Sequence, residues 1–370
     1  MTMTNETAKS VKLRVYIPIL KTQPDGTITA GFGVRTLLDV DCNNESALDG
    51  VLRSLNELKW SIWIKWMIRW LIIQFEAQRS GDVVKIFTSY HAPFFASGHL
   101  VVIHDIIPFR FPLRYPAQTF YVRNFLGTVL SSSDGVVVIS QTVKDGLVAL
   151  FPLIRNKVTV IPSFSTRASV SITANGLSPV VRERTKFLMV GLTRRHKNLD
   201  WGVASVEAAA SAVSGISLDA VGVWKEFWPD VIALVESPGW KSRVCLHGYL
   251  DDTELDRMYR RSTALLYLSC DEGMGLPPLE AMARDCPVIC SDIPIFREVC
   301  GEAAFYVPLG DVVALSSLLK MLACGELESQ VQRKSILGRE RVAHYGSDRL
   351  RASWRVLISR YSQWRSSEVI

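Results

Sequence analysis

A chain of 370 residues is longer than one typical hydrophobic core supports, and it suits two domains of ordinary size. Hydrophobic residues make up 48% of the sequence and charged residues 21%, a balance that excludes a disordered or collagen-like protein. The formal net charge of +6 permits contact with phosphates or anionic lipid. No helix-turn-helix, zinc-finger or aromatic RNA-binding signature accompanies that charge, so we set nucleic-acid binding aside.

The sequence pattern shows neither a signal peptide nor a membrane-spanning helix. Residues 1–10 are polar, and no run of about eighteen apolar residues is free of charge. The seven cysteines show no metal-ligand spacing, and most of them fall in a region that we expect to be buried: Cys245, Cys270, Cys286, Cys290 and Cys300. Small buried thiols of this kind fit a reduced, cytoplasmic protein.

Short runs rich in Val and Ile alternate with longer helical patterns along the N-terminal half. This alternation predicts strands at 11–20, 84–88, 100–103, 136–139 and 158–161, and helices at 34–40 and 142–150. Ser, Thr, Asn, Gly and Pro then dominate residues 163–184, which we interpret as an interdomain linker.

The alternation resumes in the C-terminal half. It predicts strands at 187–190, 218–221, 244–246, 264–267 and 288–291, and helices at 198–212, 255–262 and 279–284. Such a pattern indicates an α/β protein with two Rossmann-like, doubly wound domains that face a central cleft. We assign residues 1–165 to the N-terminal domain, 175–345 to the C-terminal domain and 346–370 to a final helical segment.

A loop containing Gly273 and Gly275 follows the buried strand predicted at 264–267 and leads into a helix that opens with two prolines. Glu272 is expected in this loop and Glu280 in the first turn of the helix, where the two carboxylates can hold different parts of one ligand. Between them, the amides of Gly275 and Leu276 and the helix N-terminus offer donors to a phosphate. The alternative is that Glu280 complements the helix dipole and Glu272 is merely solvated.

A basic segment follows the strand predicted at 187–190. Gly191 provides a turn, and Arg194, Arg195 and Lys197 come directly after it. Fixed cations at the carboxyl end of a strand can stabilise the charge that develops on a leaving diphosphate. A solvated basic loop is the alternative.

The N-terminal half contributes three weaker motifs. His104 follows a predicted buried strand, where a lone histidine is usually structural. Gly31 and Gly33 do not form a dinucleotide fingerprint, because Thr36 occupies the third glycine position, and this argues against an NAD-dependent dehydrogenase. The Asp-Val-Asp sequence at 39–41 falls at a predicted helix end, so we interpret it as surface rather than a metal site.

The segment Glu-Gly-Met-Gly-Leu-Pro-Pro-Leu-Glu-Ala-Met-Ala, followed by Cys-Pro-Val-Ile and Ser-Asp-Ile-Pro-Ile-Phe-Arg-Glu-Val, resembles the donor-binding signature of retaining GT-B glycosyltransferases. More narrowly, it resembles glycosyltransferase family four, also called group 1, which includes many bacterial mannosyltransferases. The resemblance extends from Gly31 to Trp354 and implies a GT-B fold in which the last helix crosses back to the first domain.

The resemblance also implies roles for the donor-binding side chains. Glu272 would hold the donor hexose and Glu280 the ribose, while Lys197 matches the lysine that binds the diphosphate. Arg194 and Arg195 remain alternates for that lysine. The sequence departs from the family at position 196, where a histidine replaces a frequent arginine.

Two further implications concern the N-terminal half. His104 matches a histidine that approaches the donor sugar near its reacting carbon, which makes it a catalytic candidate with Glu272 and Lys197. The turn at Gly31 and Gly33 would close over the diphosphate and the acceptor. Neither a metal nor a cofactor is expected beyond the nucleotide diphosphate sugar, which is the donor substrate.

A tryptophan-rich segment at residues 59–70 has cations between its aromatic residues. On a helix its tryptophans suit a membrane interface, and a core helix with snorkelling cations is the equal alternative; the residues concerned are Trp60, Trp63, Trp66 and Trp70. The membrane alternative predicts peripheral contact with anionic lipid at the inner face of the cell membrane.

We therefore expect a retaining, metal-independent hexosyltransferase of bacterial polysaccharide biosynthesis. The resemblance favours transfer of mannose from GDP-mannose to a hydroxyl of a glycan or lipid-linked acceptor. The alternatives are a catalytically silent binding or assembly protein of the same fold and a sugar-nucleotide epimerase of similar architecture.

Overall fold

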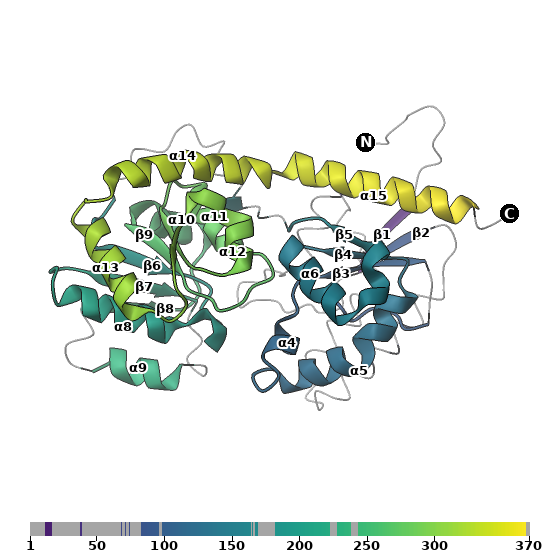
Figure 1. Cartoon of the computed structure of the whole chain (residues 1–370), viewed down its shortest axis with the longest axis horizontal. Helices are drawn as coiled ribbons and strands as arrows, with labels where there is room; N and C mark the ends of the chain where they lie inside the picture. Colours follow the sequence, from purple (N-terminus) through teal and green to yellow (C-terminus); the bar gives the residue numbers. More distant parts are fainter. Residues whose placement is uncertain are drawn as a thin grey trace. The chain divides into compact units, whose positions relative to one another are not determined.

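The computed structural model describes most of the chain. The described residues are 12–16, 83–95, 98–163, 165, 167–168, 182–222, 228–237 and 243–367, with isolated positions at 38, 68, 71 and 74. The chain divides into two compact units, one formed by Met1–Phe164 with Ser347–Ile370 and the other by Ser165–Gly346 (Figure 1). None of the described helices is both long enough and apolar enough to span a bilayer.

The first unit contains a five-stranded sheet in the order β1-β2-β3-β4-β5, and all neighbouring strands run parallel. The strands are β1 (Lys12–Tyr16), β2 (Val83–Phe87), β3 (His99–Ile103), β4 (Gly135–Val138) and β5 (Val158–Val160). Every residue of the central strand β3 is buried, as expected for a parallel sheet that is covered on both faces.

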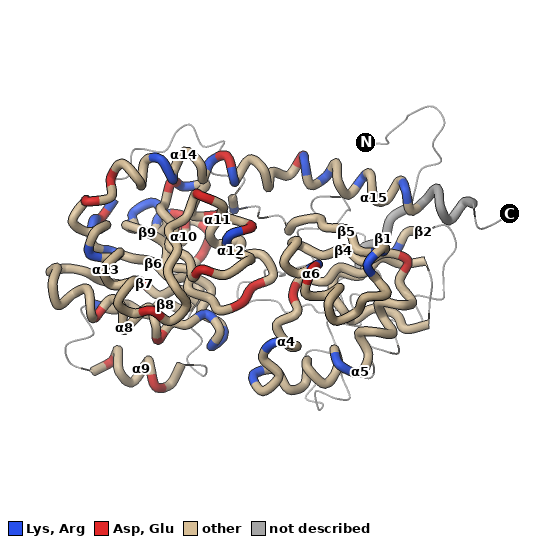
Figure 2. The backbone as a smooth tube through the Cα atoms, in the orientation of Figure 1, with Lys and Arg blue, Asp and Glu red and all other residues tan. Residues whose placement is uncertain are grey.

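The described helices of this unit are α4 (Ile107–Arg110), α5 (Pro116–Ser132), α6 (Gln141–Leu150) and α15 (Ser347–Ser367). Aromatic side chains pack between α5 and the loop after β2. The ring of Phe94 in this loop stacks on the ring of Phe125 on α5, with their centroids 5.5 Å apart. Arginines recur along α15 (Figure 2). The hydroxyl of Tyr361 on α15 donates a hydrogen bond to Asp134, which precedes β4.

The second unit contains a six-stranded parallel sheet in the order β11-β10-β9-β6-β7-β8. Its strands are β6 (Lys186–Met189), β7 (Ser217–Val221), β8 (Val244–His247), β9 (Ala264–Tyr267), β10 (Val288–Ser291) and β11 (Phe305–Val307). The chain builds outward from β6 to one edge, and then returns to β9 and builds outward to the other edge. The topological switch point therefore lies between β6 and β9, where open α/β sheets bind their ligands.

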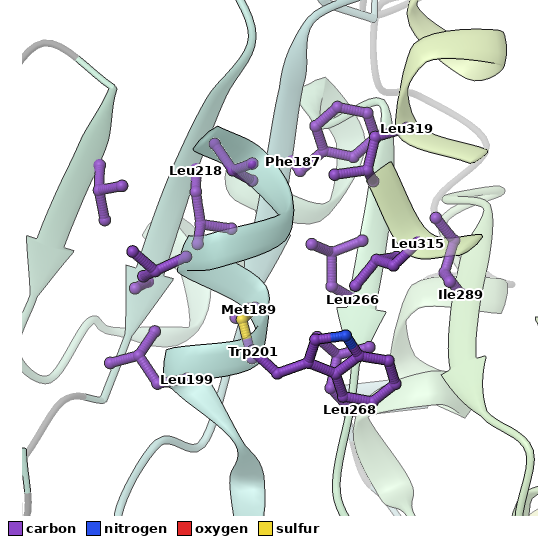
Figure 3. Close-up of a cluster of buried hydrophobic side chains, with 14 of the residues drawn as sticks. Phe187, Met189, Leu199, Trp201, Leu218, Leu266, Leu268, Ile289, Leu315 and Leu319 are labelled. Carbon is purple, nitrogen blue, oxygen red and sulfur yellow. The ribbon is translucent and has the colours of Figure 1, made fainter. Parts of the chain in front are cut away.

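The described helices of the second unit are α8 (Leu199–Ala210), α9 (Pro229–Val235), α10 (Asp252–Arg261), α11 (Leu276–Met282), α12 (Pro294–Cys300), α13 (Val312–Ala323) and α14 (Glu328–His344). Apolar side chains of α8 and α13 pack on one face of the sheet (Figure 3). Phe187 and Leu266 from the strands meet Leu315 and Leu319 of α13 in this core, and all four side chains are fully buried.

The observed elements confirm the α/β class, and the strands predicted between residues 84 and 291 are all present. The short strand β11 was not predicted, because its three residues at a sheet edge give too little pattern. The prediction that Cys245 is buried is wrong, since it is exposed on the edge strand β8. Of the helix predicted at 34–40 only position 38 is described, and the Asp-x-Asp sequence lies outside the described residues.

Replacement of Leu319 by Ala should lower the free energy of unfolding of the second unit by about 2–5 kcal/mol, because it leaves a cavity in the core between α13 and the sheet. Val313→Ala is the matched control on the same helix, since Val313 is 75% exposed, and it should change stability by less than about 0.5 kcal/mol. Denaturant unfolding of both variants would measure this, and equal losses would contradict the packing described above.

Candidate functional site

The two strands at the switch point each continue into a loop, and hydrogen bonds tie these loops together. After β6, Gly191 adopts a positive φ of 72° and the chain forms a short 3-10 turn, Arg195–Lys197. The side-chain amide of Asn198 donates to the carbonyl of Leu268 after β9, at 2.8 Å. The amide of Cys270 donates to the carbonyl of His196, at 2.9 Å. These bonds hold the basic loop against the acidic loop.

Lys197 and Glu272 meet at this junction as a charged pair. The Lys197 ammonium donates to Glu272 Oε1, and their side chains are only 13% and 12% exposed. Glu272 Oε1 also accepts from the Tyr267 hydroxyl at 3.0 Å and from the Ser269 hydroxyl at 2.7 Å. Tyr267 in turn accepts from Lys197 at 3.2 Å. The carboxylate is thus anchored through Oε1, and none of these hydrogen bonds involves its Oε2 atom.

The surroundings of Glu272 favour its charged form. Burial alone would raise the pKa of its carboxyl, but the positive charges of Lys197 and His196, with the bonds from Lys197 and Ser269, bring that pKa below 4.5. His196 is buried, and its Nε2 atom lies 4.0 Å from Glu272 Oε1. Burial, followed by the neighbouring charge of Glu272, raises the pKa of Tyr267 well above 10, so its hydroxyl remains a proton donor.

The second glutamate lies on α11. Glu280 is the fifth residue of this helix and therefore falls in its second turn, not in the first turn predicted from the sequence, because the helix begins earlier, at Leu276. Its carboxylate is buried, and it accepts from the Ser165 hydroxyl at 2.8 Å through Oε1 and from the Tyr259 hydroxyl at 3.2 Å through Oε2. The carboxylate is thus already held by neutral hydroxyl donors.

The start of α11 is a tight turn. Gly275 has a φ of 96°, and a Cβ atom there would lie 3.1 Å from the ring of Phe296, so the position suits glycine. Pro277 and Pro278 follow within the first turn and have no N–H group. The amides of Gly275 and Leu276 are therefore the backbone donors that remain at this end of the helix. Gly273 is buried in the preceding loop.

The other two cations of the basic loop lie near its start. Arg195 forms an ion pair with Asp230, with Nη1 3.1 Å from Oδ2, and its guanidinium lies 4.9 Å from the ring centre of Trp228. Arg194 is half-exposed at the N-cap of the 3-10 turn. Of the three predicted cations, Lys197 is the one that the structure joins to Glu272.

His104 belongs to the first unit and directly follows β3. Its Nε2 atom lies 2.9 Å from the carbonyl of Thr88, which can only accept, so Nε2 carries the proton and donates. Burial lowers the pKa of the imidazole below 6.5, against the opposing effect of that carbonyl. The ring is therefore neutral at pH 7, with Nδ1 as an acceptor. Asp105 beside it accepts the amide of Ile107 at 3.0 Å, which fixes the start of α4.

Several site residues were not identified from the sequence. Tyr267, Ser269, Tyr259, Ser165 and His196 surround the two glutamates, and only tertiary contacts reveal them. Of these residues, only Tyr267 could have been suspected from the sequence, because it places a polar hydroxyl at the last position of a strand that is predicted to be buried. The predicted glycines Gly31 and Gly33 lie outside the described residues, as do Trp60, Trp63, Trp66 and Trp70.

Comparisons with known proteins agree with this arrangement. Residues 178–335, which include both switch-point loops, match the family described as glycosyl transferases group 1. The chain is 27% identical over 290 residues to the O-antigen chain mannosyltransferase RfbU of Salmonella typhimurium, covering 78% of this chain and 76% of the relative. It is also 27% identical over 226 residues to the serotype-specific mannosyltransferase WbdA of Escherichia coli, of which it spans only 27%.

The structure of TarM from S. aureus, solved in complex with UDP, superposes with a TM-score of 0.61 at 13% identity. The superposition covers 78% of this chain and 58% of TarM. The fold is GT-B. Its two Rossmann-like domains correspond to the two sheets described above, and the switch-point loops belong to the second of them.

Removal of one partner of the Lys197–Glu272 pair should destabilise the protein. Lys197→Met leaves a mostly buried carboxylate without its cation, which should cost about 3 kcal/mol at pH 7. The stability that Glu272 contributes in the native protein is present above its unfolded pKa and lost as the pH falls through its lowered folded pKa. In Lys197→Met, protonation instead relieves the stranded charge, so the gap to the native protein should narrow as the pH falls.

A double-mutant cycle with Glu272→Gln separates the pair from its surroundings. The double variant Lys197→Met/Glu272→Gln should lose less stability than the two single variants added together, because it contains no unpaired charge. Denaturant unfolding between pH 4 and pH 8 would measure this; strict additivity at pH 7 would show that the two side chains do not interact.

His104 should titrate below pH 6.5, since burial disfavours its charged form. Long-range proton–nitrogen NMR should show a neutral ring protonated at Nε2, as its bond to Thr88 requires. The neutral His104 ring contributes its full share to the free energy of unfolding above pH 6.5. That contribution should decline as the pH falls from 6.5 toward the lower folded pKa. A pKa above 6.5 would contradict the geometry.

Proposed function

We propose that this chain is a glycosyltransferase that moves a hexose from a nucleotide diphosphate sugar to an acceptor hydroxyl. One observation carries the proposal: Lys197 and Glu272 form a charged pair at the topological switch point of the second sheet, and the side-chain hydrogen bonds that anchor Glu272 end on Oε1 and do not involve Oε2. A cation and a free carboxylate oxygen in one place suit a ligand that has both a phosphate and sugar hydroxyls.

Lys197 is the residue suited to the diphosphate. Its ammonium has three hydrogens, and Glu272 and Tyr267 engage it on one side. A phosphate oxygen can take a remaining hydrogen without breaking the pair. The negative charge that grows on the leaving diphosphate then meets a cation that is already in position, which costs little reorganisation.

Glu272 and Glu280 suit the two sugars of the donor. Glu272 Oε2 can accept from a hexose hydroxyl while Oε1 stays anchored to the protein. Glu280 is bound to the hydroxyls of Ser165 and Tyr259, which are the kind of donors that a ribose also presents. A ribose hydroxyl that replaces Ser165 would preserve the bond to the buried carboxylate. The amides of Gly275 and Leu276 offer further donors to the diphosphate.

The proposed reaction is retaining and independent of metal. The bond between the sugar's anomeric carbon and the phosphate oxygen breaks, the acceptor oxygen bonds to that carbon from the same face, and the leaving phosphate takes the acceptor's proton. His104, neutral and with Nδ1 as an acceptor, is proposed to orient the donor sugar near the anomeric carbon. Lys197 supplies the positive charge that a metal supplies in other transferases.

GDP-mannose is the proposed donor, and a glycan or lipid-linked hydroxyl in bacterial polysaccharide synthesis is the proposed acceptor. Support for this choice comes from the relatives RfbU and WbdA, both of which are mannosyltransferases. Thermal-shift measurements with GDP, UDP and dTDP sugars test the donor, because a ligand that binds the folded state raises the melting temperature. A shift with UDP sugars alone would overturn the choice of GDP-mannose.

Transfer assays with purified protein test the activity itself. Lys197→Ala should lower kcat by about 100-fold or more, since it removes a charge that stabilises the transition state. Glu280→Gln should raise the KM for the donor by about tenfold, since it weakens charge-assisted bonds to the ribose. Lys320→Ala on α13 is the matched control and should leave both parameters unchanged.

NMR of the product then decides the class of reaction. A glycoside with the anomeric configuration of the donor supports the proposal, whereas the opposite configuration would exclude retention. Interconversion of the nucleotide sugar without an acceptor would identify an epimerase. Donor binding with neither transfer nor hydrolysis would identify a silent binding protein.

A further inference from the structure

A second polar cluster lies on the other half of the same sheet. Asp219 is on β7, and Cys245 and His247 are on the edge strand β8. Asp219 is paired directly with Cys245 across the two strands, and His247 lies two residues farther along β8. Side chains two residues apart in a strand point to the same face, so the register alone gathers the three side chains.

These side chains present one sulfur, one nitrogen and one oxygen atom within 4.8 Å of one another. His247 Nε2 lies 2.8 Å from Asp219 Oδ1. Cys245 is exposed, the His247 side chain is 23% exposed and the Asp219 side chain 6%, so the cluster is anchored at its inner end and accessible from solvent at its outer end.

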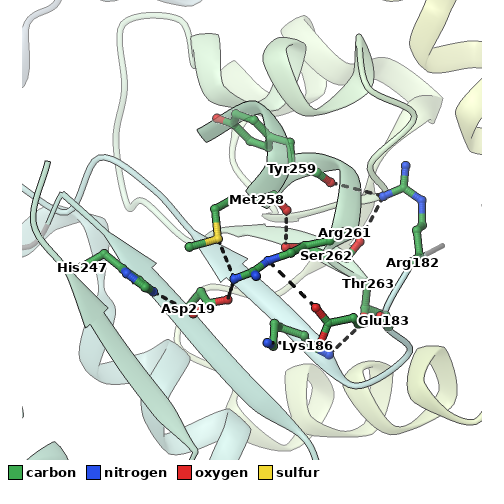
Figure 4. Close-up of polar contacts among 10 residues, drawn as sticks. All are labelled: Arg182, Glu183, Lys186, Asp219, His247, Met258, Tyr259, Arg261, Ser262 and Thr263. Carbon is green, nitrogen blue, oxygen red and sulfur yellow. Dashed lines mark hydrogen bonds and ion pairs between the residues drawn. The ribbon is translucent and has the colours of Figure 1, made fainter. Parts of the chain in front are cut away.

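The ion pair with Arg261 accounts for the burial of the Asp219 side chain but not for the cysteine and the histidine beside it. The guanidinium of Arg261, at the end of α10, lies 3.0 Å from Asp219 Oδ2 and also contacts Glu183 (Figure 4). This cation already compensates the buried carboxylate. The other carboxylate oxygen, Asp219 Oδ1, faces the thiol of Cys245 and the imidazole of His247.

We propose that Asp219, Cys245 and His247 bind a zinc ion, with water as the fourth ligand. Zn²⁺ is bound in a tetrahedral arrangement by cysteine sulfur, histidine nitrogen and carboxylate oxygen atoms. The three side chains here offer one atom of each kind, and water can take the fourth position. On binding, the Cys245 thiol releases its proton to solvent, and the proton that His247 Nε2 shares with Asp219 passes through solvent to Nδ1, so that the neutral imidazole binds the metal through Nε2. Arg261 holds Asp219 through Oδ2 and keeps Oδ1 directed at the metal.

The site would hold the edge strand β8 to β7. It does not involve the loops after β6 and β9 that contain Lys197 and Glu272, so its effect is on the stability of the second unit and not on sugar transfer. The spacing of cysteines in the sequence could not reveal this site, because Asp219 comes next to Cys245 and His247 only when β7 pairs with β8.

Cobalt substitution in the tag-free full-length chain tests the proposal. The Cys245 sulfur is one of the three proposed ligand atoms. Titration with Co²⁺ should therefore produce a thiolate-to-cobalt charge-transfer band in the near ultraviolet with one ion per chain, and Zn²⁺ should displace it. Bound Zn²⁺ should also raise the melting temperature.

Cys245→Ser should abolish the charge-transfer band, and His247→Gln should weaken Zn²⁺ binding by at least about tenfold, since loss even of a residue that only orients a ligand costs that much. Cys324→Ser is the matched control, because Cys324 is also exposed but lies at the end of α13, and it should bind as the native chain does. Both cluster variants should retain the native far-ultraviolet circular dichroism spectrum.

Absence of a cobalt band in the native chain would overturn the proposal. It would also be overturned if the band persisted in Cys245→Ser, if it disappeared in Cys324→Ser, or if His247→Gln bound Zn²⁺ as tightly as the native chain.

Discussion

The buried contact between Lys197 and Glu272 is the interaction on which the candidate site depends. Two opposite charges taken out of water are stable only when good geometry and additional hydrogen bonds offset their desolvation. Tyr267 and Ser269 supply those bonds to Glu272, and Asn198 fixes the approach of the two loops by bonding to Leu268. The pair thus places a cation and a carboxylate at the switch point before any ligand arrives.

The two glutamates differ in how many of their carboxylate oxygens already accept side-chain hydrogen bonds. Glu272 is anchored through Oε1, so in the proposed function a sugar hydroxyl would bind Oε2 without disturbing the pair. Glu280 has both oxygens occupied by hydroxyl groups, so a ligand there must exchange with Ser165 or Tyr259. One carboxylate is open and the other is exchangeable, which suits a ligand with two sugars on either side of a phosphate. Groups fixed in this way need little rearrangement when charge develops.

The same sheet carries both polar clusters by the same geometric rule. Parallel strands place side chains from distant parts of the sequence next to each other, in the loops after β6 and β9 for Lys197 and Glu272, and within the paired strands β7 and β8 for Asp219 and Cys245. The core of α8 and α13 occupies the face to which Leu218 and Ala220 point. Asp219 alternates with them and so lies on the opposite face, against Arg261. Its charge is buried there because α10 brings a cation to it.

The sequence by itself determined the α/β class, the positions of most buried strands along the chain and the two segments that hold the site. Hydrophobic runs, glycine turns and prolines are local signals, so Glu272, Glu280 and the group of cations at 194–197 could be selected from residue type and from position after a strand, whereas the family resemblance favoured Lys197 within that group. Tertiary structure alone decided which cation meets which carboxylate: Lys197 pairs with Glu272, whereas Arg195 turns to Asp230. It also decided the helix turn that holds Glu280, the hydroxyls that surround it and the exposure of Cys245. These features depend on strand pairing and on contacts between residues far apart in the chain, which no local pattern encodes.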